Sequence, residues 1–223
     1  MLRSTHLAEA APPQNGDTLV SELLIGAGAA VSVIGVDAER SKYALVTMVH
    51  VRLRPYVESD AVLMFEAARE SVKEAHPWMP WCHPTYQLSE AQDWIRNQIR
   101  FFADSAEYMF VMESDSGLYL GGCGLNQINS EHRCANLGYW VRSSRVGRGI
   151  ATHAVKLLAE WAFSHTNLVR LEILSAVDNK PSQRVAERAG AVREGVLRKR
   201  LQIHGVWHDA VVFSITRAPR PVA

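Results

Sequence analysis

The stretch from Val141 to Phe163 constrains the fold more than any other part of the chain, because a strand, a glycine-rich turn and a helix follow one another directly. The apolar segment NLGYWV, residues 136–141, predicts a strand. A short polar loop follows and ends in VGRGIA, residues 146–151. Beyond it the apolar residues recur with helical spacing, which predicts a long amphipathic helix. Its inward stripe is expected to consist of Ile150, Ala154, Leu158 and Trp161.

A turn of this kind is able to bind an anion at the start of the helix. The first N–H groups of a helix have no partner within it, and the helix dipole adds partial positive charge there. Gly147 and Gly149 let the backbone approach a phosphate that a side chain would block. An ordinary glycine turn has the same sequence, and two spaced glycines do not separate these alternatives.

The composition indicates one globular domain of ordinary charge. The chain has 223 residues, of which 48% are hydrophobic and 21% charged, and its formal net charge is +1. That balance argues against a nucleic-acid or membrane-surface partner. Cys82, Cys123 and Cys134 show no paired spacing, which disfavours a disulfide framework and favours a reducing cytoplasm. The histidine and cysteine spacings of metal sites are missing, so no metal is expected.

The first 47 residues differ in composition from the rest, and we expect a disordered or loosely packed extension there. Their apolar segment, residues 19–36, makes a poor secretory signal because the long region before it carries little positive charge. It makes a poor membrane helix because it holds three glycines and is of borderline length. Translation that starts naturally at Met48 is the other explanation. We therefore place the domain at residues 48–218, with 219–223 as a tail.

A first strand and two helices open the domain. Apolar residues alternate with His50, Arg52 and Arg54, which predicts a half-buried strand that ends near Pro55. One helix is expected from Ser59 or Asp60 to about Ser71, and a second from Ser89. The residues expected to face inward are Val62, Phe65 and Ala68 on the first, and Trp94, Ile95, Ile99 and Phe102 on the second.

The segment between these helices, residues 76–84, contains three prolines and cannot form a regular element. Trp78 and Trp81 give it a large apolar surface. It is either a lid over the core or the wall of a substrate pocket, and the sequence favours neither. Both tryptophans are candidate substrate-binding residues.

The rest of the domain predicts a meander of strands and one more helix. Short polar turns between the next three strands predict antiparallel pairing. Asn179 is a suitable N-cap for the last helix, Pro181 fits its first turn, and Gly190 fits its end. The strands are expected at residues 107–114, 118–129, 134–141, 168–177, 192–204 and 206–216.

Taken in order, several motifs of residues 48–216 resemble the GNAT superfamily of N-acetyltransferases, and most closely its RimJ/RimL type, which acetylates ribosomal-protein N-termini. The motifs are LRPY, WMPW, LGYWV, GRGIAT, DNKPSQRVAERAGAVREG and HDAVVFSI. The resemblance implies a mixed α/β (α+β) fold with about four helices. Its central sheet of about seven strands is mostly antiparallel and is splayed between the fourth and fifth strands. Acetyl-CoA is the implied co-substrate, with no metal.

The resemblance also places the cofactor. Pyrophosphate is expected on the loop 146–152, and the pantetheine arm on the backbone of residues 138–141. Family members usually start the loop with Gln or Arg, whereas this chain has Val146, so at most one polar contact is lost and the backbone donors remain. Arg145 and Arg148 are either phosphate ligands or solvated side chains. The implied cofactor-binding residues are Tyr139, Trp140, Val141, Arg145, Val146, Gly147, Arg148, Gly149, Ile150, Ala151, Thr152, Asn179 and Ser182.

Two catalytic candidates follow from the family's Asn-x-x-Ser pattern. The resemblance implies that Asn179 contacts the cofactor arm and that Ser182 lies near the thioester sulfur as a possible acid. Asn179 is equally explained as a helix cap, and the Ser182 hydroxyl by a local hydrogen bond. No base is assigned, because Asn136 stands where many relatives have Glu. The remaining alternatives are Glu194, His208, Asp209 or a water relay.

The expected function is the transfer of an acetyl group from acetyl-CoA to a primary amine, foremost the N-terminal amine of a protein such as a ribosomal protein. The alternatives are a small-molecule amine (antibiotic, polyamine or amino acid) as acceptor, and a module that binds acyl-CoA without catalysis. Neither a nucleic acid nor a membrane is expected as a partner. The chain is expected to be a monomer or a homodimer in the cytoplasm.

Overall fold

The computed structural model describes residues 50–218. The expected tail at 219–223 and the extension at 1–47 lie outside the described residues. Seven strands, four α-helices and one short 3₁₀ turn, η1, follow the expected order. Their bounds are β1 Val51–Pro55, α1 Asp60–Ala75, α2 Leu88–Ala103, β2 Tyr108–Ser114, β3 Tyr119–Asn129, β4 Cys134–Val141, η1 Ser143–Arg145, α3 Ile150–His165, β5 Arg170–Ala176, α4 Lys180–Arg188, β6 Val192–Ile203 and β7 Val206–Thr216.

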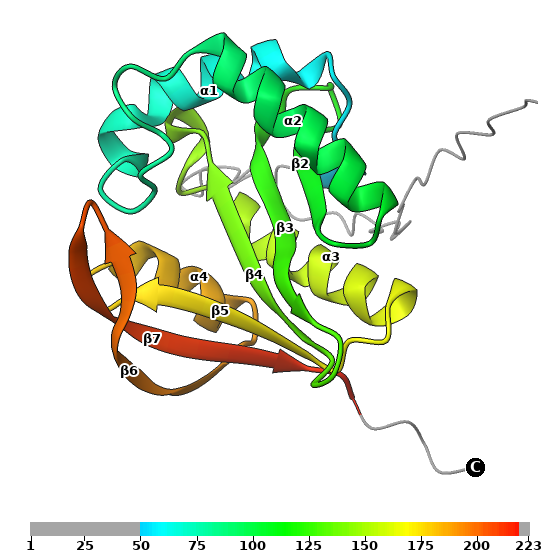
Figure 1. Cartoon of the computed structure of the whole chain (residues 1–223), viewed down its shortest axis with the longest axis vertical. Helices are drawn as coiled ribbons and strands as arrows, with labels where there is room; N and C mark the ends of the chain where they lie inside the picture. The colour runs from blue at the N-terminus through cyan, green and yellow to red at the C-terminus, as the bar shows by residue number, and fades with distance from the viewer. Residues whose placement is uncertain (1–49, 219–223) are drawn as a thin grey trace, which may run out of the picture.

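The seven strands form one sheet in the order β1-β2-β3-β4-β5-β7-β6 (Figure 1). All neighbours are antiparallel except β4 and β5, which are parallel. Within the described chain, the ladder between β4 and β5 spans only Cys134–Asn136 against Arg170–Glu172. The two strands diverge beyond these pairs, as Figure 1 shows. The mixed α/β fold with a splayed central sheet is confirmed.

Helices cover both faces of the sheet and create two hydrophobic clusters. On one face α3 packs its apolar stripe against the strands, and Ala154 and Leu158 are fully buried there. On the other face α1 and α2 contribute Met64 and Ile95 to a second cluster that also contains Tyr119 of β3. The stripe expected on α3 is therefore confirmed, because Ile150 and Trp161 are buried as well.

Helices α1 and α2 correct the expected inward residues. Val62 and Ile99 were expected to face inward but are 48% and 37% exposed. Met64 is buried on α1, which also runs to Ala75 rather than ending near Ser71. On α2 the buried position next to Ile95 belongs to a polar residue, Gln98. An apolar residue is not required to be inside, and side-chain type alone does not fix the face of a helix.

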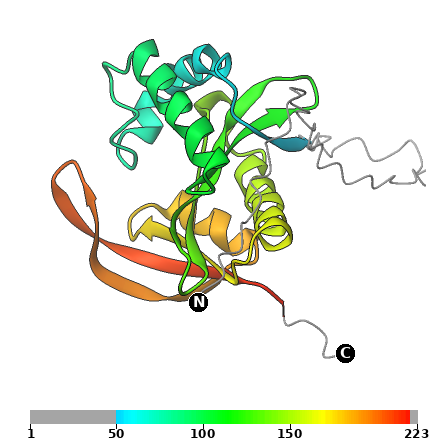
Figure 2. The ribbon, with the colours of Figure 1, turned by 45° about the vertical axis from the view of Figure 1, so that its right-hand side comes forward.

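The long β6–β7 hairpin curves out of the sheet toward the side that carries α1 and α2 (Figures 1 and 2). Near its tip, the ring Nε2 of His204 lies 2.8 Å from the carbonyl oxygen of His76, directly after α1. The two imidazole rings also contact each other at a tilt of 57°, with centroids 4.3 Å apart. The hairpin tip and the α1–α2 segment thus touch across the splayed side of the sheet.

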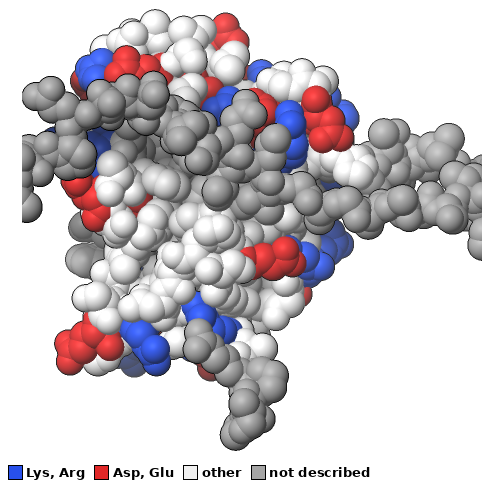
Figure 3. Space-filling view, turned by 90° about the vertical axis from the view of Figure 1, so that its right-hand side faces the viewer, with Lys and Arg blue, Asp and Glu red and all other residues white. Residues whose placement is uncertain are grey.

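The described surface carries charges of both signs. On the face in Figure 3, Lys and Arg side chains lie near Asp and Glu side chains at several places on the visible described surface, with uncharged residues between them. None of the described helices combines the length and the hydropathy that a bilayer span needs.

Candidate active site

The glycine loop has the geometry expected at the start of α3. Gly147 and Gly149 both have φ of +77°, in the left-handed region that glycine adopts without strain. Gly149 is the N-cap of α3, so the unpartnered N–H groups of the first turn lie directly beyond it. A Cβ added to either glycine would meet no other atom within 4 Å. The loop therefore presents open backbone at a helix N-terminus.

Helix α1 holds the chain that leads into this loop. The carboxylate of Glu70 accepts hydrogen bonds from the Ser144 N–H, at 2.8 Å, and from the Arg142 guanidinium. The Ser143 N–H donates to the Ser71 hydroxyl at 2.9 Å, and the Ser143 hydroxyl donates to Glu74 at 2.7 Å. Arg142 lowers the pKa of Glu70 to about 2, so the carboxylate is charged at neutral pH. These contacts between α1 and residues 142–144 are called the α1 clamp below.

The divergence of β4 from β5 leaves backbone groups free along β4. The Arg142 N–H donates to Leu120 O, and the β3–β4 register places Trp140 opposite Gly122. Because hydrogen-bonded pairs alternate in an antiparallel ladder, the N–H and C=O of Tyr139 and Val141 point away from β3, toward the gap. Such an edge is able to pair with an extended ligand.

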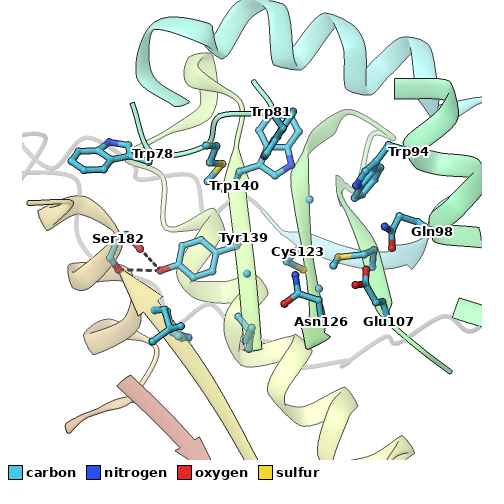
Figure 4. A pocket seen from close by; sticks show the side chains of 18 of the residues that line it. Trp78, Trp81, Trp94, Gln98, Glu107, Cys123, Asn126, Tyr139, Trp140 and Ser182 are labelled. Carbon is cyan, nitrogen blue, oxygen red and sulfur yellow. Dashed lines mark hydrogen bonds between the residues drawn. The ribbon is translucent and has the colours of Figure 1, made fainter. Parts of the chain in front are cut away.

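Tyr139 and Ser182 meet beside this edge, although 43 positions separate them in sequence. The Tyr139 hydroxyl donates to the Ser182 carbonyl oxygen at 3.0 Å and lies 3.1 Å from the Ser182 Oγ (Figure 4). Burial raises the pKa of Tyr139 to about 12, so its hydroxyl is protonated at neutral pH. Asn179 is the N-cap of α4, where its side-chain oxygen accepts from the Ser182 N–H at 3.2 Å.

Two cavities open on either side of this contact. One, of about 500 Å³, is lined by the glycine loop and the first turns of α3 and α4. The other, of about 700 Å³, lies among α1, α2, β3, β4, the end of β5 and the tip of the β6–β7 hairpin. We call them the loop cavity and the aromatic cavity. The residues that line both are Trp78, Met79, Tyr139, Trp140, Asn179 and Ser182.

The two cavities carry opposite charge. Arg145, Arg184 and Arg188 line the loop cavity, and its one carboxylate, Glu74, already accepts from Ser143. The Nε atom of Arg145 is buried without a partner among the described residues. Glu90 and Glu107 line the aromatic cavity, and no Lys, Arg or His of the described chain lines it. The loop cavity therefore suits phosphates, and the aromatic cavity suits a cation.

Aromatic side chains form much of the second cavity. Trp81 contacts Trp140 edge to face, with ring centroids 5.3 Å apart. Gly122 on β3 makes room for this packing, because a Cβ there would lie 2.5 Å from the Tyr56 hydroxyl and 3.1 Å from the Trp140 Nε1. Trp78 lies where the two cavities meet. Both tryptophans of the α1–α2 segment thus line a cavity wall.

Comparison with known proteins identifies the family. The model of the "Acetyltransferase (GNAT) domain" family matches residues 50–192, which is more than half of the chain. This chain belongs to the GNAT acetyltransferases. It is therefore an acetyl-CoA-dependent N-acetyltransferase, and acetyl-CoA is its co-substrate. The described residues contain no cluster of His, Cys, Asp or Glu that could hold a metal ion.

Several relatives are similar along most of their length. A Bacillus subtilis (strain 168) protein named "Putative ribosomal N-acetyltransferase YdaF" is 29% identical over 178 residues, which is 75% of this chain and 92% of that protein. The spermidine N(1)-acetyltransferase of Escherichia coli (strain K12) is 31% identical over 112 residues, 50% of this chain and 60% of that one. The structure of Mycobacterium smegmatis RimJ in complex with CoA-disulfide has a TM-score of 0.69 at 28% identity, and covers 74% of this chain and 81% of its own.

The cofactor-binding residues expected for a GNAT enzyme fall mostly on the loop cavity. All of them line it except Arg148, which is exposed on the loop and does not line either cavity. Val146 is 58% exposed. Arg184 and Arg188 were missed by sequence reasoning, although their spacing places them on one face of the short helix α4.

The candidate bases of this GNAT enzyme are engaged elsewhere. Glu194 accepts from Arg170 at 2.7 Å and from the Ser214 hydroxyl at 2.6 Å, and Arg170 lowers its pKa to about 2. Asn136 donates to Asn126. Neither His208 nor Asp209 lines either cavity, and Asp209 accepts from the Lys199 N–H. None of the side-chain bases that the sequence offered, Glu194, His208 or Asp209, therefore lines either cavity.

Proposed function

We propose that this enzyme acetylates the N-terminal amine of a protein, with a ribosomal protein as the foremost candidate. The observation that carries the proposal is the aromatic cavity of about 700 Å³, which reaches the Tyr139–Ser182 contact and has room for the first residues of a peptide. The name of the B. subtilis relative, a putative ribosomal N-acetyltransferase, points to the same class of acceptor.

The chain's own residues supply three parts of this reaction. The glycine loop and the arginines of the loop cavity bind the phosphates of acetyl-CoA. The free N–H groups of Tyr139 and Val141 orient the pantetheine and stabilise the oxyanion that forms at the acetyl carbonyl. As the N–C bond forms and the C–S bond breaks, one proton passes from the hydroxyl pair of Tyr139 and Ser182 to the leaving thiolate, and the pair recovers a proton from the newly acetylated nitrogen. The proton of the attacking ammonium leaves through water.

A polyamine is the second candidate acceptor. The specific observation in its favour is that Glu90 and Glu107 line the aromatic cavity, while no cationic side chain of the described residues does. A relative named spermidine N(1)-acetyltransferase points the same way.

Mass spectrometry distinguishes these acceptors. The full-length protein is incubated with acetyl-CoA and short peptides that have the N-termini of ribosomal proteins. Fragmentation then places the acetyl group on the peptide. Acetylation of the α-amine is expected, and the same peptides with a blocked N-terminus are expected to stay unmodified. Turnover of spermidine with no modified peptide would transfer the assignment to the second candidate.

A further inference from the structure

The aromatic cavity contains a buried polar atom that no described residue satisfies. Gln98 of α2 is only 6% exposed and lines the cavity. Its side-chain carbonyl oxygen, Oε1, is buried and has no hydrogen-bond partner. A buried acceptor without a partner destabilises the folded protein, so such atoms in native structures usually bind a ligand or water. The Gln98 carbonyl is therefore available to a hydrogen-bond donor in this cavity.

A free carboxylate lies at the same end of the cavity. Glu107 also lines it, and its N–H donates to Phe101 O at 3.3 Å, which holds it against the last turn of α2. Figure 4 shows the Gln98 amide and the Glu107 carboxylate together, at the end remote from Tyr139 and Ser182. No ion pair within residues 50–218 involves Glu107. Nearby Arg100 donates to Asn97 and does not line the cavity.

The other carboxylate of the cavity is already engaged. Glu90 accepts from the Gln87 N–H at 2.8 Å as part of the capping box of α2, and it lies 3.0 Å from the His83 Nε2. Trp94 lines the cavity beside Gln98 and offers an aromatic surface (Figure 4). The carboxylate and the amide carbonyl accept hydrogen bonds, and the carboxylate and the face of the indole ring attract positive charge.

We propose that Glu107 and Gln98 bind a second positive charge of the acceptor, separate from the amine that is acetylated. This inference rests on the proposed acetylation of a primary amine and adds that the acceptor carries a second cation. Tyr139 and Glu107 lie at opposite ends of the cavity in Figure 4, so an amine that reacts beside Tyr139 is remote from Glu107. Glu107 therefore selects the acceptor and does not remove its proton. A peptide with a basic residue near its N-terminus and a polyamine both present this chemistry.

Steady-state kinetics on matched acceptors test the proposal. Two short peptides differ only at position two, which is arginine in one and its neutral analogue citrulline in the other. Spermidine and a monoamine of similar length form the second pair. The full-length protein is compared with Glu107→Gln, Gln98→Met and the control Glu131→Gln, which loses a carboxylate from the exposed β3–β4 turn.

For the wild-type protein, KM for the cationic member of at least one pair is expected to be about tenfold lower than for its neutral partner. Glu107→Gln is expected to abolish that difference with kcat for the cationic acceptor retained. Gln98→Met is expected to weaken it, and Glu131→Gln to leave it unchanged. Added salt raises KM for the cationic acceptor only. Calorimetric titration with CoA reports whether each variant retains the cofactor site.

The outcomes separate this inference from the proposed function. Turnover of spermidine, sensitive to Glu107, with no turnover of peptides would keep the inference and reject the N-terminal acceptor. Acetylation of the acceptors by the wild-type protein with equal KM for the cationic and the neutral member of both pairs would overturn the inference alone, whether or not the variants fold. If the CoA-loaded protein neither acetylates nor binds any of the four acceptors, both are overturned.

Discussion

The two cavities differ in charge, in wall chemistry and in the elements that build them. The loop cavity takes its walls from backbone at two helix N-termini and from Arg145, Arg184 and Arg188. The aromatic cavity takes its walls from side chains of α1, α2, β3 and β4, and its charged groups are Glu90 and Glu107. The two cavities meet at Tyr139 and Ser182.

Because of this difference in charge, each of the two cavities favours a different substrate. A polyphosphate placed in the aromatic cavity would face carboxylates, and an ammonium placed in the loop cavity would face guanidinium groups. Like charges at close range cost several kcal/mol in a desolvated site, so each substrate is excluded from the other's cavity. In the proposed reaction, the reacting atoms of the two substrates meet at the Tyr139–Ser182 contact.

A negative charge added to the loop cavity is expected to have the largest effect on the difference between the two cavities. Gly149→Glu places a carboxylate at the N-terminus of α3, where we propose that the phosphates bind, and is expected to raise the CoA dissociation constant about 100-fold. Isothermal titration calorimetry measures it. Gly117→Glu is the matched control, because Gly117 has a φ of +78° with open space around it in the β2–β3 turn. If the CoA dissociation constant rises equally in Gly149→Glu and Gly117→Glu, backbone strain and not the added charge explains the effect.

Removing the hydroxyl where the cavities meet should affect chemistry and spare binding. Tyr139→Phe is expected to lower kcat about tenfold, because a proton donor to the thiolate is lost while Ser182 remains, and to leave the CoA dissociation constant unchanged. Since burial raises the pKa of Tyr139 to about 12, its contribution should persist up to about pH 10. The measurement is kcat against pH for the variant, the wild type and Tyr108→Phe, whose hydroxyl lies outside both cavities.

Neutralising the arginines of α4 one at a time should reduce the charge difference between the two cavities in small steps. Arg184→Gln and Arg188→Gln are each expected to raise the CoA dissociation constant about threefold, since exposed charge pairs contribute less than about 1 kcal/mol each. Added salt should reduce the difference in CoA dissociation constant between each variant and the wild type, because salt screens the charges. Arg198→Gln, on the exposed strand β6, supplies the control. If Arg184→Gln or Arg188→Gln has the same CoA dissociation constant as Arg198→Gln at low salt, the arginine replaced in that variant does not belong to the cofactor site.

Acid should release the α1 clamp. The folded-state pKa of Glu70 is lowered from 4.5 to about 2, so the stability that its carboxylate contributes is complete above pH 4.5 and lost as the pH falls toward 2. Glu70→Gln should therefore lower Tm by a few degrees at neutral pH, and the difference from wild type should shrink between pH 4.5 and 2. Thermal unfolding followed by circular dichroism measures both curves. A Tm difference that is constant across this range would contradict the assigned ion pair with Arg142.

The sequence was sufficient to predict what local rules control. The alternation in β1, the helical spacing of α3, the glycine loop and the Asn179 cap each depend on a few neighbouring residues, and all four agree with the structure. The splayed sheet and the family came from motifs spread along the chain, and both are confirmed.

What could not be predicted depends on contacts between distant positions. Arg142 and Glu70 are 72 positions apart in the sequence, and no pattern in a single sequence predicts an ion pair between them. Gln98 follows the apolar stripe of α2 at helical spacing, but an amide is ordinarily assigned to the wet face. Glu107 reads as the start of a strand, and its place in a cavity follows only from its contact with α2.

The short β4–β5 ladder has a consequence for aggregation. A strand with unpaired N–H and C=O groups usually invites pairing with another protein molecule. In this fold the unpaired length of β4 is interior, with β3 on one side and the end of β5 across a cavity. The gap admits a slender chain such as pantetheine, whereas a foreign β-strand would have to displace β5. The unpaired N–H and C=O groups of β4 are thus accessible to the cofactor but not to the β-strands of other protein molecules in a crowded cell.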